Sequence, residues 1–396
     1  MTSDRISRRA LVGGAAAASL LTLGLPTRRT LWAAPPPTSP VILGRCQSYD
    51  LGDVATCLRV MMDQLGALDT LVAGKTVAVK VNVSGGTRGP FLGLPAGRTY
   101  QVHPSVVHAL ATLLDRAGAR RIRILESTKW RAPLEQSLSL SGWDINAFRA
   151  LKAAVEFEDT RNFGSGTHYV GVRVPGGGSL YPGYYLNHSY TDCDVFVSVA
   201  KLKNHETAGV TLSMKNSFGI TPNALYGQST HDETSTENRL DMLHTGKIRP
   251  PQGLPLEIDP SAPRRATYRV PRVTVDMVGI RPIDLALIDG IETVSGGEGP
   301  WVQGLKLQQP KLLIAGRNAV CTDAIACACM GYAPAAAPGT GPFPGDNHLA
   351  LAAQQNLGTH RPEEIEIRGL TVQEALHPFR WEPKRAGASS HRARPA

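Results

Sequence analysis

The clearest pattern of hydrophobic and polar residues lies between residues 75 and 127. An apolar run over residues 76–82 predicts a buried strand. Apolar residues then recur at helical spacing from Pro104 until Gly118, and proline suits the first turn of a helix. A second apolar run over residues 121–125 predicts the next strand. Strand, helix and strand in this order predict a parallel sheet.

Shorter patterns extend this prediction along the chain. We expect further strands at residues 194–199, 283–288, 311–315 and 364–367, and helices at residues 319–330 and 347–355. Two stretches with few apolar periods, residues 164–190 and 219–269, are too long for ordinary loops and predict insertions. The sequence therefore predicts an α/β fold, with an open, mostly parallel sheet, helices on both faces and long loop insertions.

The chain divides into four predicted parts: a leader at residues 1–34, a lead-in at residues 35–74, a single α/β domain at residues 75–383 and a basic, disordered tail at residues 384–396. Arg8 and Arg9 stand before a weakly apolar run, a pattern typical of a twin-arginine export signal. We therefore expect the twin-arginine export machinery as a partner and a periplasmic location. The apolar run is too short and too mild for a stable membrane span.

The net charge of +9 comes from the ends of the chain. Nine of the 42 Lys and Arg residues but only one of the 33 Asp and Glu residues lie in the leader and the tail. The segment between them is nearly neutral, and aromatic residues make up only 6% of the chain. A nucleic-acid-binding surface needs clustered basic residues, so we expect no nucleic-acid partner.

The six cysteines include no CxxC pair, so we expect no ferredoxin-type iron–sulfur cluster. Cys327 and Cys329 lie in an apolar run, where cysteine is typical of a small core residue. Cys46 and Cys57 could pair in an oxidising compartment, and the sequence leaves this open.

Several lysines point to an anion-binding pocket. Lys201 and Lys203 directly follow the strand at residues 194–199, and ligands of open α/β sheets bind at the carboxyl ends of strands. Lys80 lies inside an apolar strand, where a lysine needs a partner or a ligand. We expect these three lysines, Arg88 of a glycine-rich loop, Lys215 and Asn216 to bind a small anionic ligand. Alternatively, the lysines pair with internal acids such as Asp289 or Asp323.

His205 is the expected acid–base residue, because a histidine beside lysines and Glu206 can be tuned around neutral pH. Alternatively, its ring is held by hydrogen bonds in a turn. Asp289, Glu292 and Glu298 form an acidic, glycine-rich stretch that could hold a cation or orient the lysines. Asp323, inside an apolar helix, is expected to pair with a buried base or a helix N-terminus.

The sequence resembles a bacterial family known as domain of unknown function 362. The similarity is carried by Val79-Lys-Val-Asn82, by Lys201-Leu-Lys-Asn-His205 and by Lys215-Asn-Ser-Phe-Gly219, and it extends over residues 75–357. Many members of this family look like exported or iron–sulfur proteins. The ferredoxin cysteines that some members carry are absent from this sequence.

A more distant resemblance is to the cofactor domain of nickel-pincer lactate racemases. It implies that Lys215 bonds a pincer nucleotide, that His205 moves a substrate proton, that His231 ligates nickel and that Arg88 contacts a phosphate. The second proton-transfer histidine of those enzymes has no counterpart at residues 127–130.

Three functions follow from these observations. The first is an exported enzyme that acts on a small carboxylate or phosphate compound by isomerase-like, racemase-like or other proton-transfer chemistry. The second is a non-catalytic periplasmic anion-binding or scaffold protein. The third is a protein associated with a metal or redox cofactor, in which His205, His231 and the acidic stretch provide the ligands.

Overall fold

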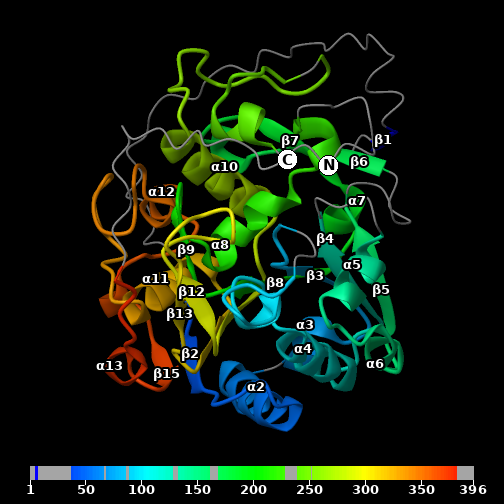
Figure 1. The fold of residues 1–396 in the computed structure, drawn as a ribbon. Coiled ribbons are helices and arrows are strands. Elements are labelled where there is room, and N and C mark those ends of the chain that lie inside the picture. The colour runs from blue at the N-terminus through cyan, green and yellow to red at the C-terminus, as the bar shows by residue number, and fades with distance from the viewer. Residues whose placement is uncertain are drawn as a thin grey trace.

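The computed structural model describes residues 37–66, 68–85, 89–127, 133–160, 168–227, 239–250 and 252–380, together with the backbone of Arg5–Ser7. Its centre is an eight-stranded sheet (Figure 1). From one edge to the other the strands are β15 (Ile367–Gly369), β2 (Val41–Arg45), β14 (Leu312–Gly316), β11 (Leu285–Gly290), β8 (Val195–Lys201), β3 (Thr76–Val81), β4 (Arg121–Glu126) and β5 (Ala154–Asp159). β14 is antiparallel to both of its neighbours, and the other neighbouring pairs are parallel.

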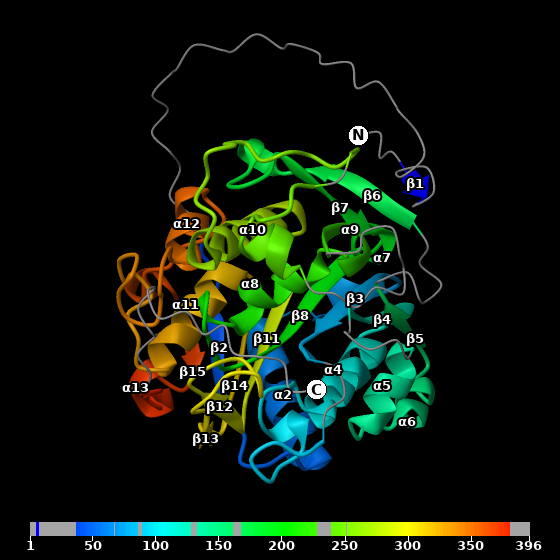
Figure 2. The ribbon, with the colours of Figure 1, turned by 45° about the horizontal axis from the view of Figure 1, so that its top comes forward.

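Helices cover both faces of this sheet because its strands are apolar on both sides. Val77 and Val79 of β3 belong to one apolar layer, whereas Ala78 between them belongs to the other. The first layer is covered by α2 (Leu51–Leu65), α3 (Leu68–Val72), α4 (Pro104–Arg116), α5 (Leu134–Leu140) and α6 (Ile145–Arg149). The second is covered by α7 (His188–Thr191), α8 (Leu212–Ser217), α9 (Asn223–Tyr226), α10 (Ala266–Ile280), α11 (Ala319–Cys329), α12 (His348–Gln354) and α13 (Val372–Ala375). Figure 2 shows α8 and α10 on the opposite side of the sheet from α2 and α4. The predicted fold class is confirmed.

Short strands outside this sheet extend its loops. β6 (His168–Arg173) and β7 (Gly183–Asn187) form a hairpin within the predicted insertion, and β1 (Arg5–Ser7) pairs with β6. Two further antiparallel pairs are β9 (Asn204–His205) with β10 (Gly209–Val210), and β12 (Thr293–Ser295) with β13 (Lys306–Gln308).

Three sequence predictions need correction. The α/β domain begins before residue 75, because β2 pairs with β14 and α2 packs on the same sheet. The predicted strand over residues 364–367 begins only at Ile367, since a 3₁₀ turn occupies Pro362–Glu364. The helix α10 was not predicted, because Pro271 inside it and the polar residues before it resemble a loop.

The predicted leader lies outside the described residues apart from Arg5–Ser7, and so does the predicted tail at residues 384–396. Within the described part of the chain, no helix has both the length and the apolar character needed to cross a membrane.

Candidate functional site

Several of the predicted site residues gather at the carboxyl ends of four neighbouring strands. These strands are β11, β8, β3 and β4, and all four run in the same direction. Lys80 and Glu126 lie at the ends of β3 and β4, while Lys201 and Asp289 lie at the ends of β8 and β11. The parallel sheet therefore brings together lysines and acids that are far apart in the sequence.

Lys201 is held in a buried ion pair with Asp289. Its Nζ lies 2.9 Å from Asp289 Oδ2, and both side chains are fully buried. The same Nζ also donates to Tyr49 Oη at 2.9 Å and to the Gly97 carbonyl at 2.8 Å. All three ammonium protons of Lys201 thus have partners. The ion pair with Asp289 is the arrangement that the sequence analysis gave as the alternative to anion binding.

Lys80 is paired in the same way with a residue of the next strand. Its Nζ lies 2.7 Å from Glu126 Oε1 and donates to the Val81 carbonyl at 2.6 Å and to Asn216 Oδ1 at 3.2 Å. Asn216 in turn donates to the Lys80 carbonyl at 3.2 Å and to Ser198 Oγ at 3.0 Å. Lys80 and Asn216 therefore fasten α8 to β3 and β8, and their polar atoms are occupied.

Lys203 is buried without an ion pair among the described residues. Its Nζ donates to the carbonyls of Tyr100 at 2.5 Å and Glu298 at 3.0 Å. Burial lowers the pKa of Lys203 to about 7; the Glu298 carboxylate opposes this shift, and the charges of Lys201 and Lys215 add to it. Small changes of pH around neutrality therefore decide whether the Lys203 amine is charged or neutral.

Lys215 has neither an ion pair nor a hydrogen bond to its side chain within the described part of the chain. Its Nζ lies 4.4 Å from the centre of the Phe218 ring, a cation–π contact that leaves its protons without acceptors. Burial lowers the pKa of Lys215 to about 7, Glu298 opposes this, and Arg239 and Lys80 lower it further. Lys215 is thus an amine for which the described residues supply neither a hydrogen-bond acceptor nor an ion-pair partner.

His205 lies beside these two lysines at the end of β9. Burial lowers the pKa of His205 well below its usual value, and the charges of Lys215 and Lys203 add to this effect. Its Nδ1 lies 3.2 Å from both the backbone nitrogen and the Oγ1 of Thr207. The Thr207 N–H can donate to a bare Nδ1, and the Thr207 hydroxyl can accept from a protonated one. The backbone N–H favours the neutral tautomer that carries its proton on Nε2, and this proton is the one that the ring can transfer.

Glu298 is the carboxylate that faces this group of cations. Its Oε2 lies 3.9 Å from His205 Nδ1 and accepts a hydrogen bond from the Glu206 backbone at 2.9 Å. Its Oε1 accepts from the Trp301 indole at 3.0 Å. The charge of Glu298 is opposite to the charges of Lys203, Lys215 and Arg239, which interact with one another in the same region. The described part of the site therefore carries net positive charge when its lysines are protonated.

Two histidines of the site were not predicted from the sequence. The ring of His244 packs edge-on against Phe218 with 5.2 Å between the ring centres, and burial followed by the charges of Lys215 and His205 lowers its pKa well below the usual value. His348, the first residue of α12, is fully buried, and its ring interacts with the Ala208 backbone. Burial, then Lys215, lowers the pKa of His348 to about 3, while the Ala208 backbone opposes the shift. No motif marks either histidine, because each comes from a separate loop or helix.

The predicted acidic stretch does not gather into one group. Asp289 binds Lys201, and Glu292 forms ion pairs with Arg98 at 2.5 Å and Lys311 at 3.3 Å. Among the described residues, no three His, Cys, Asp or Glu side chains are placed to hold a metal ion together. His231 and Arg88 lie outside the described residues, so their expected roles as nickel ligand and phosphate contact stay predictions.

Asp323 holds the start of the helix that carries Lys215. Its Oδ1 accepts hydrogen bonds from the Ser213 backbone at 2.9 Å and the Ser213 hydroxyl at 2.5 Å, and its Oδ2 accepts from the Met214 backbone at 2.8 Å. The preceding residue, Leu212, has a φ of 44°, a conformation that costs energy for a side chain of this size. Asp323 therefore bonds a helix N-terminus, one of its two expected partners.

Replacing Asp323 by alanine is expected to lower the free energy of unfolding by about 2–4 kcal/mol, because it leaves buried donors at the start of α8 without an acceptor. Equilibrium denaturation in urea measures this loss. The control is Asp63→Ala, since Asp63 is exposed and pairs only with the exposed Arg59, so its removal should change stability by less than about 0.5 kcal/mol. Equal stability of the two variants would show that Asp323 does not anchor the helix.

Comparisons with known proteins agree with the family resemblance. The model of the family described as domain of unknown function (DUF362) matches residues 77–328. A similar curated protein is the thylakoid-associated protein sll1697 of Synechocystis, which is 26% identical over 193 residues, covering 46% of this chain and 50% of that protein. The chain thus spans about half the length of the curated relative it matches.

A solved structure that aligns with part of this chain is the lactate racemase apoprotein from Thermoanaerobacterium thermosaccharolyticum. It aligns with a TM-score of 0.35 and 14% identity, over 68% of this chain and 54% of that chain. A likeness of this size does not bear on the chemistry of the site.

Proposed function

The chain belongs to the DUF362 family, and we propose that it is an enzyme that acts on a small carboxylate or phosphate compound at the site around Lys215. One observation carries this proposal: the Lys215 ammonium has no acceptor within the described residues although its side chain is half-buried. A partly buried charge without a partner is costly, and an anionic ligand would reduce that cost. Lys203, which also lacks an ion pair among the residues that the structure describes, lies close enough to Lys215 for their charges to interact.

The residues divide into anion binders and a proton-transfer group. Lys203 and Lys215 bind the anion, whereas Lys80 and Lys201 support the sheet edge through their own carboxylates. His205 transfers a proton at the carbon next to the anionic group. The electron pair of the broken C–H bond moves onto the carboxylate oxygen, which the lysine ammonium groups stabilise by donating hydrogen bonds.

The anion-binding part of this proposal is tested by calorimetric titration with malonate and with inorganic phosphate at pH 6.5. We expect saturable binding of at least one of them, and Lys215→Met should weaken it about 10–100-fold through loss of a charged hydrogen-bond donor. The control Lys152→Met removes an exposed lysine and should leave binding unchanged. Equal binding by the Lys215 and Lys152 variants, or no binding by the unchanged protein, would contradict the proposal.

Export is a separate part of the proposal, supported by Arg8 and Arg9 before the apolar run. The full chain should reach the periplasmic fraction of its host, and Arg8→Lys with Arg9→Lys should keep it in the cytoplasm. An unchanged distribution between the fractions would contradict twin-arginine export.

A further inference from the structure

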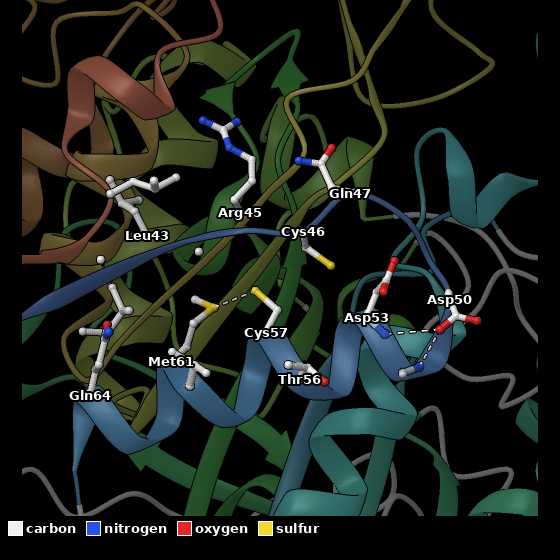
Figure 3. A pocket seen from close by; sticks show the side chains of 16 residues that line it. Leu43, Arg45, Cys46, Gln47, Asp50, Asp53, Thr56, Cys57, Met61 and Gln64 are labelled. Atoms are coloured by element: carbon white, nitrogen blue, oxygen red, sulfur yellow. Dashed lines mark hydrogen bonds between the residues drawn. The ribbon is translucent and has the colours of Figure 1, made fainter.

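A pocket far from Lys215 in the sequence lies between β2 and α2, and it holds two cysteines. The cavity has a volume of about 610 Å³, and Cys46 at the end of β2 and Cys57 in the middle of α2 both line it (Figure 3). Figure 3 shows the Cys46 thiol directed towards α2 and the Cys57 thiol directed towards β2. Cys46 is a buried residue and Cys57 is a half-buried one.

Gly44 allows α2 to approach the strand closely at this point. A Cβ atom on Gly44 would lie 2.9 Å from Cys57 Sγ and 2.6 Å from Met61 Sδ, so no larger residue fits there without a shift. Gly44 and Cys46 are two residues apart on an extended chain, and their side-chain positions therefore point to the same face. The Cys57 sulfur thus lies over the face of β2 from which the Cys46 thiol projects.

The two thiols also interact with each other and differ in reactivity. The contact with Cys57, together with burial, raises the pKa of Cys46 well above its usual value. The contact with Cys46 lowers the pKa of Cys57, although burial opposes this shift. A thiolate is the attacking form in thiol–disulfide exchange, so Cys57 is the attacking residue.

We propose that Cys46 and Cys57 form a reversible disulfide when the protein meets a disulfide oxidant, either a small molecule or a protein. The Cys57 thiolate attacks one sulfur of the oxidant, forms a mixed disulfide and releases the other sulfur as a thiol. The Cys46 thiol then loses its proton and attacks Cys57 Sγ, which releases the second thiol of the oxidant. Two thiols of the protein are oxidised, and one disulfide of the oxidant is reduced.

The loop that this disulfide closes carries a residue that supports the sheet edge. Tyr49 lies between the two cysteines, and its Oη donates to Asp289 Oδ1 at 2.8 Å and accepts from Lys201 Nζ at 2.9 Å. Its ring stacks on His103 with 3.8 Å between the ring centres. The disulfide therefore fixes the chain on both sides of a tyrosine that completes the buried Lys201–Asp289 pair.

The proposal is tested on the full chain, purified reduced and then incubated with oxidised glutathione. Trypsin releases both cysteines in one peptide, residues 46–59, because Arg45 and Arg59 flank it. After alkylation and digestion, we expect this peptide to carry no alkyl group and to be about 2 Da lighter than its fully reduced form, since two hydrogens are lost when the disulfide forms. The oxidised protein should also melt about 5 °C higher, because the disulfide restricts the unfolded chain. The rise is no larger than this because the closed loop is short.

Three variants make the result specific. Cys46→Ser should stop the reaction at the mixed disulfide on Cys57. Cys57→Ser should prevent both the mixed disulfide and the internal disulfide from forming. Cys193→Ser removes a half-buried thiol elsewhere and should leave the internal disulfide unchanged. The proposal is overturned if peptide 46–59 of the unchanged protein still takes two alkyl groups, or if it ends as a lasting glutathione adduct on Cys57. Neither outcome depends on whether Lys215 binds an anion.

Discussion

Replacing Lys201 by methionine is expected to lower the free energy of unfolding by about 3–5 kcal/mol. The substitution removes the ammonium that lies 2.9 Å from Asp289 Oδ2 and leaves a fully buried carboxylate without its counter-charge. The remaining donors to Asp289 are neutral groups and replace only part of the lost stabilisation: the His103 backbone at 3.0 Å, Tyr49 Oη at 2.8 Å and the Ile291 backbone at 3.2 Å. Equilibrium denaturation followed by circular dichroism measures the loss.

The double variant Lys201→Met with Asp289→Leu should recover most of this loss, because it buries no charge. Lys311→Met is the matched control, since Lys311 pairs with Glu292 at 3.3 Å in a partly exposed position and should cost less than about 1 kcal/mol. A loss for Lys201→Met as small as that of Lys311→Met would mean that the ion pair does not support the sheet edge.

Replacing His205 by glutamine should slow proton transfer by about 100- to 10,000-fold while the fold is kept, because glutamine can form hydrogen bonds but cannot exchange a proton near neutral pH. The measurement uses 2-hydroxy acids, lactate and malate, incubated with the protein in heavy water. Proton NMR then follows the loss of the signal from the hydrogen on the carbon next to the carboxylate. The 2-hydroxy acids are chosen because this hydrogen lies next to the anionic group that Lys215 is proposed to bind.

His188→Gln is the control, since His188 lies on α7 and pairs with Asp192 at 3.1 Å, away from the residues that surround Lys215. It should exchange the hydrogen as fast as the unchanged protein. Equal exchange by the His205 and His188 variants would remove His205 from the mechanism. Binding of malonate without exchange of either 2-hydroxy acid by the unchanged protein would favour the non-catalytic anion-binding function instead.

The sequence predicted most of the sheet because its strands are buried on both faces and therefore form continuous apolar runs. The run over residues 76–82 became β3 at Thr76–Val81, and the helix after His103 became α4 at Pro104–Arg116. The short strand β2 was missed, since five residues that include a glycine and an arginine give little pattern. The residues of β14 also do not indicate that it runs antiparallel to its neighbours, because strand direction depends on the strands with which it pairs.

The sequence singled out the residues of the candidate site that follow the strands, and it did not single out those that distant segments bring beside them. His205, Lys203 and Lys215 lie close to β8 in the sequence, so the end of one strand identified them. His348 comes from α12, and no local pattern distinguishes a histidine that faces Lys215 from one that packs in a core. The role of Lys201 was decided by Asp289, 88 residues later, and only the parallel pairing of β8 with β11 brings the two together.

The central claim is that Lys215, which has no ion-pair partner within the described residues, binds an anion through its charge. The direct measurement is the rate of acetylation of Lys215 by acetic anhydride between pH 5 and 10, read by mass spectrometry with and without malonate. The pKa of Lys215 is lowered to about 7, so the amine is charged and unreactive below pH 7 and neutral and reactive above it. The account predicts a midpoint near pH 7 that malonate moves upward, because a bound anion stabilises the charged form. A midpoint near the ordinary lysine value of about 10.4, unchanged by malonate, would contradict it.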